Sequence, residues 1–117
     1  MSMDVTRFRY EQEQLRTMFG LPLVRFADAD AWPSFGVQFP CGRFLVQAHF
    51  ATDHPFSPPR VQVHPAPRSR HYYDDGRGLH LCYLHPNEWR PTYTMATVVG
   101  IVRVFLAKYD LGSAECH

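Results

Sequence analysis

The stretch CGRFLVQAHFATDHPFSPPRVQVH, residues 41–64, decides the fold. Its first half predicts a half-buried strand, because four apolar side chains recur at a period of two: Phe44, Val46, Ala48 and Phe50. Pro58 and Pro59 cannot donate to a sheet ladder, so the segment around them must be a stiff connection. The alternating RVQVH at 60–64 predicts a second strand, antiparallel to the first because the connection is short.

Two more strands are expected upstream of this stretch. LPLVRF at 21–26 is bounded by a turn-prone ADADA, and WPSFGVQF at 32–39 ends at Pro40 and Gly42, which favour a turn. Short connections between all four strands predict an antiparallel meander. The chain from 65 to 78 shows no periodicity and is expected to be a long irregular loop.

Helices are expected at both ends. In DVTRFRYEQEQLRTMFG, residues 4–20, Asp4 is a suitable cap, Gly20 a stop, and apolar residues recur at helical spacing. TMATVVGIVRVFLAKYD, residues 94–110, starts at a capping Thr94; its length and spacing favour a long helix, although its β-branched content also suits a strand. The predicted class is α+β, with an N-terminal helix, a four-stranded meander, an irregular loop and a C-terminal helix.

The bulk composition restricts the class of protein. The 117 residues fit one domain, 1–117, with a core of about 4–110 and a tail at 111–117. Hydrophobic residues make up 45% and charged residues 20%, which is ordinary globular material. A net charge of +1 argues against a dedicated nucleic-acid binder, which usually carries a basic face.

The N-terminal segment and the cysteines bear on the compartment. The first residues are charged throughout, which is unlike a signal peptide, and no run approaches the ~18 apolar residues of a membrane span. Cys41, Cys82 and Cys116 are odd in number and widely spaced, which argues against a disulfide framework. A cytoplasmic, reducing compartment is therefore expected. Cys41 is interpreted as structural and Cys116 as a thiol of the tail.

Four motifs, in this order, resemble the ubiquitin-conjugating enzyme family. They are CGRFLVQAHF at 41–50, DHPFSPPRVQV at 53–63, GLHLCYL at 78–84 and WRPTYT at 89–94. The second is similar to the family's Tyr-Pro-Phe-x-x-Pro-Pro-x-Val signature, with His54 in the aromatic position. The third resembles the segment that bears the active-site cysteine. The likeness covers nearly the whole chain, up to about residue 109, and implies the family's α+β fold.

By this resemblance Cys82 is the nucleophile. It would accept a ubiquitin-like modifier from an activating enzyme as a thioester and transfer it to an amine of a protein acceptor. A thiol suits this chemistry, because even an unshifted cysteine is a few per cent thiolate at neutral pH. The fold must then add positioning and a donor for the developing oxyanion.

The sequence departs from the family before Cys82. Where eukaryotic members carry His-Pro-Asn, this chain has RHYYDDG, so His71 matches but Tyr72 and Tyr73 replace Pro and Asn. Losing one oxyanion donor typically costs ~10²–10³ in rate, so either another group does this job or catalysis is weak. Candidates are His71, Tyr73, His80 and His85, of which His85, three residues after Cys82, is favoured as a polariser or base. A loop histidine bonded to backbone remains its alternative.

The chain also lacks the two helices that typical members carry after the long one. The compact build resembles bacterial conjugating-enzyme-like proteins of conjugation or antiphage operons. The resemblance implies that an activating enzyme docks on the first helix, with Arg7, Arg9 and Arg16, and that no small-molecule cofactor is needed, because the partner consumes ATP. Trp89 and Pro91 are expected to wall the active-site segment.

Two rival interpretations remain open. Enzyme-variant and RWD-type domains share this fold but lack the cysteine and act as inactive protein-binding modules. The environment of Cys82 discriminates the two, because a conjugating thiol must lie in a solvent-reachable groove, whereas an inactive module would tolerate its burial. A zinc site is the other rival, since four residues of competent type lie close in sequence: His71, His80, Cys82 and His85. Structural zinc sites usually pair their ligands in two clusters, and no second cluster is visible, so no metal is expected.

Overall fold

A computed structural model describes residues 3–65, 72–74, 79–81, 83–84 and 86–109. The elements follow in chain order: α1 (Val5–Phe19), β1 (Val24–Arg25), the 3₁₀ helix η1 (Trp32–Ser34), β2 (Phe35–Cys41), β3 (Phe44–His49), β4 (Arg60–His64), β5 (Tyr72–Asp74), β6 (Leu79–Leu81), the 3₁₀ helix η2 (Pro86–Glu88) and α2 (Met95–Tyr109). The class is therefore α+β, as expected from the sequence.

Strands β1 to β4 form one antiparallel sheet in the order β1-β2-β3-β4. This confirms the meander, and β4 has the bounds that the alternation at 60–64 predicts. The first strand is much shorter than expected. The predicted second strand begins late because 32–34 form η1, where Pro33 sits in the first turn of a helix rather than in a ladder.

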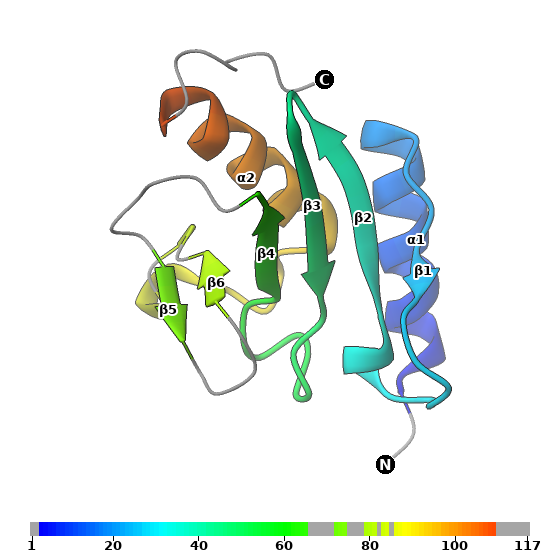
Figure 1. Cartoon of the computed structure of the whole chain (residues 1–117). Helices are drawn as coiled ribbons and strands as arrows, with labels where there is room; N and C mark the ends of the chain where they lie inside the picture. The colour runs from blue at the N-terminus through cyan, green and yellow to red at the C-terminus, as the bar shows by residue number, and fades with distance from the viewer. Residues whose placement is uncertain (1–2, 66–71, 75–78, 82, 85, 110–117) are drawn as a thin grey trace.

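A second sheet corrects the expected irregular loop at 65–78. β5 and β6 pair antiparallel, with Tyr73 opposite His80, and β6 lies against β4 (Figure 1). Three-residue strands give too few side chains for a period of two to be detected, which is why this pair was missed.

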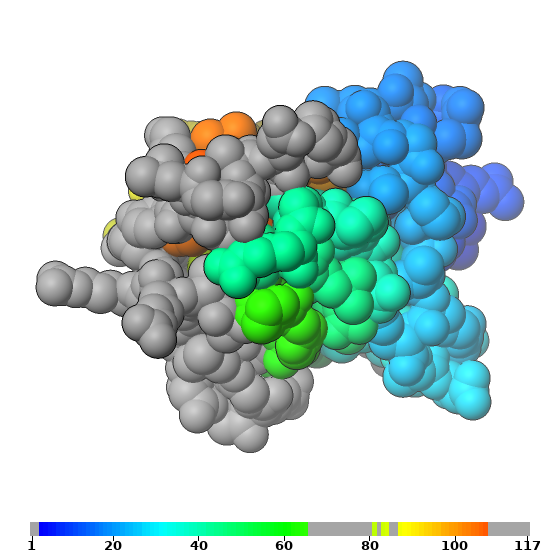
Figure 2. All heavy atoms as spheres, turned by 45° about the horizontal axis from the view of Figure 1, so that its top comes forward, coloured from blue at the N-terminus to red at the C-terminus, as the bar shows by residue number. Residues whose placement is uncertain are grey.

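One face of the four-stranded sheet carries the core, and Figure 1 shows both helices on that side. The inward residues of β3 and β4 are almost fully buried: Phe44, Val46, Ala48, Val61 and Val63. α1 contributes Leu15, and α2 contributes Met95, Ala96, Val98, Val99, Val102 and Leu106. The opposite face presents Gln38, Gln47 and Gln62, which are register partners across three strands. In the space-filling view α1 lies along one side of the sheet (Figure 2).

Both ends of α1 and the start of α2 agree with the sequence. The Asp4 carboxylate accepts hydrogen bonds from the backbone N–H groups of Thr6 and Arg7, at 2.9 and 3.2 Å, and so caps α1. Gly20 ends it in the left-handed region, at φ 65°. The Thr94 hydroxyl accepts from the backbone N–H of Thr97 at the start of α2. Within the described part of the chain, no helix is long and apolar enough to cross a membrane.

Cys41 corrects the expectation of a chain without disulfides. Its side chain is buried at the end of β2 and is disulfide-bonded. Cys82 and Cys116 both lie outside the described residues. Cys41 is structural, as its turn position predicted. Its role comes from a disulfide bond, which the odd number and wide spacing of the cysteines did not indicate.

Candidate active site

Three of the four predicted site residues, Cys82, His85 and His71, lie outside the described residues. Tyr73 is described by its backbone alone, in β5, where it pairs with His80. The structure therefore leaves these assignments as predictions. It does describe the residues on both sides of position 82, which we call the frame.

The chain is anchored immediately before and after position 82. Leu81, the last residue of β6, is 1% exposed and belongs to the core. The Tyr83 hydroxyl donates a 2.7 Å hydrogen bond to the carbonyl of Pro59, and the half-buried Leu84 packs on the core. Pro59 carries its carbonyl on a stiff Pro-Pro backbone, so this bond has a rigid acceptor. Three residues around position 82 are thus held by packing or by a hydrogen bond.

Trp89 fixes the other side of the frame. Its indole N–H donates to the carbonyl of Pro55 at 2.8 Å, and its ring meets Tyr93 edge-to-face with centroids 5.5 Å apart. Trp89 is 8% exposed, whereas Pro91 is exposed. Trp89 is therefore the packing element that the sequence predicted, and Pro91 is not.

Tyr83 and Trp89 both donate hydrogen bonds to the connection between β3 and β4. A buried carboxylate, that of Glu11, holds this connection in place. Glu11 of α1 is fully buried, and its Oε2 lies 2.8 Å from Nε2 of His54. Its Oε1 accepts from the backbone N–H of Met95 at 2.7 Å, at the start of α2. Arg7 donates to Oε2 at 3.0 Å. One carboxylate thus joins both helices to the connection.

The His54 ring has a determined tautomer. Glu11 accepts at Nε2, and Nδ1 is buried with no partner among the described residues. Because a carboxylate oxygen can only accept, the proton of this hydrogen bond belongs on Nε2. Trp32 and Phe50 stack around the ring, with centroids 4.6 and 4.5 Å away. His54 is a structural residue.

Sequence reasoning missed Glu11, although α1 contains a signal. Glu11 lies on the apolar stripe of the helix, between Phe8 and Leu15, where a charged side chain must be paired to be buried. Arg7, one turn earlier, is the paired cation. What the sequence lacks is any indication that His54, 43 residues away, completes the set.

The predicted docking arginines of α1 differ in availability. Arg7 is largely buried, and besides Glu11 it donates to the carbonyls of Pro91 and Tyr93, at 3.0 and 2.6 Å. Arg9 and Arg16 are exposed. Arg16 pairs with Glu13 at 2.6 Å. This hydrogen bond and the positive charge of Arg16 lower the pKa of Glu13, and the same hydrogen bond and the negative charge of Glu13 raise the pKa of Arg16.

The described residues offer no metal centre, and the comparisons with known proteins assign no function. The described residues contain no group of three or more His, Cys, Asp or Glu side chains that would hold a metal ion, and most of the suspected zinc ligands lie outside them. The chain matches no protein-family model, no curated protein and no solved structure.

Proposed function

We propose that this chain is a ubiquitin-like-protein conjugating enzyme with Cys82 as its thioester-forming nucleophile. The observation that supports this most is the contact between the motifs on which the family resemblance rests. Tyr83, next to Cys82, donates to Pro59, and Trp89 of the Trp-x-Pro motif donates to Pro55. Motifs separated along the chain thus build one rigid frame beside the nucleophile's position.

The reaction needs two acyl transfers at that position. The Cys82 thiolate attacks the carbonyl carbon of the modifier's thioester on the activating enzyme; a new C–S bond forms, and the activating enzyme's thiolate leaves. An acceptor amine then attacks the Cys82 thioester, a C–N bond forms, the Cys82 thiolate leaves, and the amine's proton passes to a base. His85, His71 and Tyr73 are the proposed helpers for that proton or for the oxyanion.

The docking face on α1 is narrower than the sequence suggested. We assign it to Arg9 and Arg16, since the guanidinium of Arg7 is bonded to Glu11, Pro91 and Tyr93. The partner's need for ATP favours a cytoplasmic reaction. The disulfide at Cys41 is the feature that argues against a reducing compartment.

The test combines the protein with the activating enzyme and ubiquitin-like protein encoded beside it, plus ATP. We expect a covalent adduct that dithiothreitol and hydroxylamine both cleave. Hydroxylamine is needed because this protein contains a disulfide, and a mixed disulfide would also yield to dithiothreitol. The adduct should vanish in Cys82→Ala and become a thiol-resistant oxyester in Cys82→Ser, while Cys116→Ala keeps it.

A partner-free measurement complements that assay. Native protein treated with iodoacetamide and digested should carry the label on Cys82, whereas the buried, disulfide-bonded Cys41 stays unlabelled. If Cys82 is unreactive and no adduct forms, the proposal is wrong, and the alternative of an inactive protein-binding module remains. If His85→Ala transfers to amine at the wild-type rate, only the helper assignment of His85 is wrong.

A further inference from the structure

Cys41 is buried at the end of β2 and is disulfide-bonded. The chain has two other cysteines, Cys82 and Cys116, and both lie outside the described residues. The structure holds a single chain, so the partner of Cys41 is one of these two. The choice matters, because a disulfide at Cys82 would occupy the proposed nucleophile, whereas a disulfide at Cys116 would leave it free.

Cys41 lies where β2 turns into β3, which we call the turn end of the sheet. Its register partner is Phe44, the first residue of β3. β4 finishes at the same end, since its last residue, His64, pairs with Leu45. A disulfide joins residues whose Cα atoms are about 4.4–6.8 Å apart, so the partner of Cys41 must come to the turn end.

Position 82 lies toward the opposite end of the sheet. The Tyr83 hydroxyl donates to the carbonyl of Pro59, the residue immediately before β4. β4 starts opposite His49, the last residue of β3. Strands rise about 3.4 Å per residue, so His49 is roughly 17 Å along β3 from Phe44, the register partner of Cys41.

Position 82 is also separated from Cys41 across the sheet. Leu81 ends β6, and β6 lies against β4 on the side away from β3 (Figure 1). Neighbouring strands are about 4.8 Å apart, so three spacings put β6 roughly 14 Å from β2. Successive Cα atoms are about 3.8 Å apart, so the Cα atoms of Cys82 and Cys41 are separated by about 10 Å or more. That separation is too long for a disulfide, which excludes Cys82.

The end of α2 brings Cys116 within reach of the turn end. Arg103 of α2 lies over the ring of Phe39 in β2, with 5.7 Å between the guanidinium carbon and the ring centroid. α2 ends at Tyr109, roughly 9 Å further along the helix axis. Residues 110–116 can then span up to about 25 Å. Cys116 is therefore the remaining partner, and the length of the chain allows the bond.

We propose that Cys41 and Cys116 form a redox-sensitive latch, which ties the C-terminal segment to the turn end of the sheet when oxidised and releases it when reduced. The latch goes beyond the proposed conjugation and does not depend on it, because Cys82 takes no part in the disulfide. It also allows a disulfide and a reactive thiol to exist in one chain, since Cys82 is the cysteine that the disulfide leaves out.

Reduction of the latch needs a dithiol as co-reactant. One thiolate of the dithiol attacks the disulfide, the S–S bond breaks, and one cysteine leaves as a thiolate that takes up a proton. The second thiolate of the dithiol then attacks the mixed disulfide and displaces the other cysteine. Two electrons pass to the protein, and the dithiol becomes a cyclic disulfide. Oxidation of the protein by such a cyclic disulfide is the reverse reaction.

Peptide mapping without reduction tests the pairing. Native protein is incubated with oxidised dithiothreitol, then unfolded in guanidinium chloride with N-ethylmaleimide and digested with trypsin. Cleavage after arginine and lysine places the three cysteines in separate peptides, 26–43, 78–103 and 109–117. We expect 26–43 linked to 109–117, and the maleimide on 78–103. A link between 26–43 and 78–103 would contradict both the latch and the nucleophile, whereas three labelled peptides would contradict the latch alone.

Thermal unfolding with and without dithiothreitol tests the effect of the latch. A cross-link from 41 to 116 restricts the unfolded chain, so reduction should lower the midpoint of the wild type by on the order of 10 °C, and re-oxidation should restore it. Cys116→Ser should unfold like the reduced wild type and should not respond to dithiothreitol. Cys82→Ser is the matched control and should respond as the wild type does. A response in Cys116→Ser, or none in the wild type, would overturn the proposal.

Discussion

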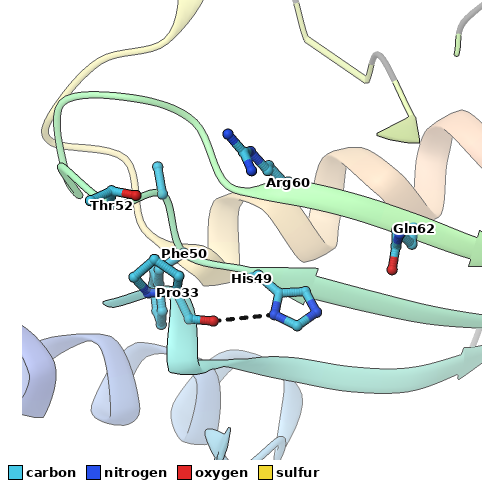
Figure 3. Close-up of a pocket in the computed structure, with 7 residues that line it drawn as sticks. Pro33, His49, Phe50, Thr52, Arg60 and Gln62 are labelled. Carbon is cyan, nitrogen blue, oxygen red and sulfur yellow. Dashed lines mark hydrogen bonds between the residues drawn. The ribbon is translucent and has the colours of Figure 1, made fainter. Parts of the chain in front are cut away.

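His49 and His54 lie five residues apart in the same stretch, and their surroundings are opposite. His54 is enclosed by Trp32 and Phe50 and shares a buried carboxylate with Arg7. His49 is half-exposed on the open face of the sheet, held by a carbonyl and lying opposite a cation. His54 is part of the buried interior, whereas His49 lines a cavity on the open face of the sheet (Figure 3).

The difference shows what decides a histidine's role. Both residues are histidines of one short stretch: His49 is the last residue of β3, and His54 lies in the connection that follows it. The neighbours of each residue come from elsewhere in the chain: the Glu11 carboxylate of α1 lies against the His54 ring, and Arg60 of β4 is the register partner of His49. The Glu11 carboxylate binds the His54 ring at Nε2 inside the core, whereas the carbonyl of Pro33 holds the His49 ring on the open face of the sheet (Figure 3).

The largest effect is expected from Glu11→Ala, which removes the carboxylate that binds His54. This change leaves His54, Arg7 and the Met95 N–H without their common acceptor. Removing one partner of a buried ion pair typically costs about 3–5 kcal/mol of unfolding free energy. Urea unfolding measures it.

Glu13→Ala is the matched control for Glu11→Ala. It removes the same side chain from the same helix, but at an exposed position, so its unfolding midpoint should stay near that of the wild type. If the two variants unfold alike, the Glu11 carboxylate does not hold the connection as described here.

The two histidines also show how far the sequence alone reaches. Local signals were sufficient for α1, where Asp4 and Gly20 marked both ends, and for β4, which alternates over its whole length. The stretch from 41 to 64 contains no indication of which residues lie beside each histidine, because tertiary folding brings those partners together.

For the candidate site, the sequence predicted more than the structure tests. The packing role of Trp89 is confirmed, since its indole bonds Pro55. The pairing of Tyr73 with His80 was not foreseen, because β5 and β6 are too short to carry a periodic pattern. Arg7 was assigned to a docking surface by the family resemblance, yet its guanidinium pairs with the buried Glu11 four residues later and is largely buried itself.

On the open side, Gly36→Ala tests the close strand approach beside His49. A Cβ at Gly36 would overlap the carbonyl oxygen of Ala48 and lie 3.0 Å from the Phe26 ring. Backbone cannot yield as a flexible side chain does, so we expect a loss of about 1–3 kcal/mol, and displaced His49 and Phe26 resonances. Thermal unfolding and amide shifts measure these effects.

Gly100→Ala is the control for Gly36→Ala. Among the described residues, its Cβ would meet the Phe19 ring at 3.7 Å, an ordinary contact, in the middle of α2. Since alanine is the better helix former, this variant should gain about 0.5–1 kcal/mol. Equal destabilisation by both alanines would show that β2 and β3 are not closely apposed at Gly36.

A smaller effect is expected from Trp89→Phe, which tests whether the His54 connection depends on bonds beyond Glu11. The change removes the N–H that donates to Pro55 but keeps an aromatic ring against Tyr93. We expect a loss of about 1 kcal/mol for the hydrogen bond, and a further amount for the smaller ring. Tyr83→Phe, which removes only a hydroxyl bonded to Pro59, should cost about 1 kcal/mol.

The smallest effect contrasts the buried Glu11 with the exposed Glu13, two residues later in α1. The hydrogen bond and charge of Arg16 lower the pKa of Glu13, so Arg16→Gln should return that pKa toward the ordinary range of a glutamate. A lowered folded-state pKa contributes stability above the unfolded value, and that contribution disappears as the pH falls through the folded pKa. Because both side chains are mostly in water, stability should hardly change at neutral pH. Carboxyl-carbon NMR titration of the two proteins measures the shift; an unchanged Glu13 pKa would mean that this ion pair does not form in solution.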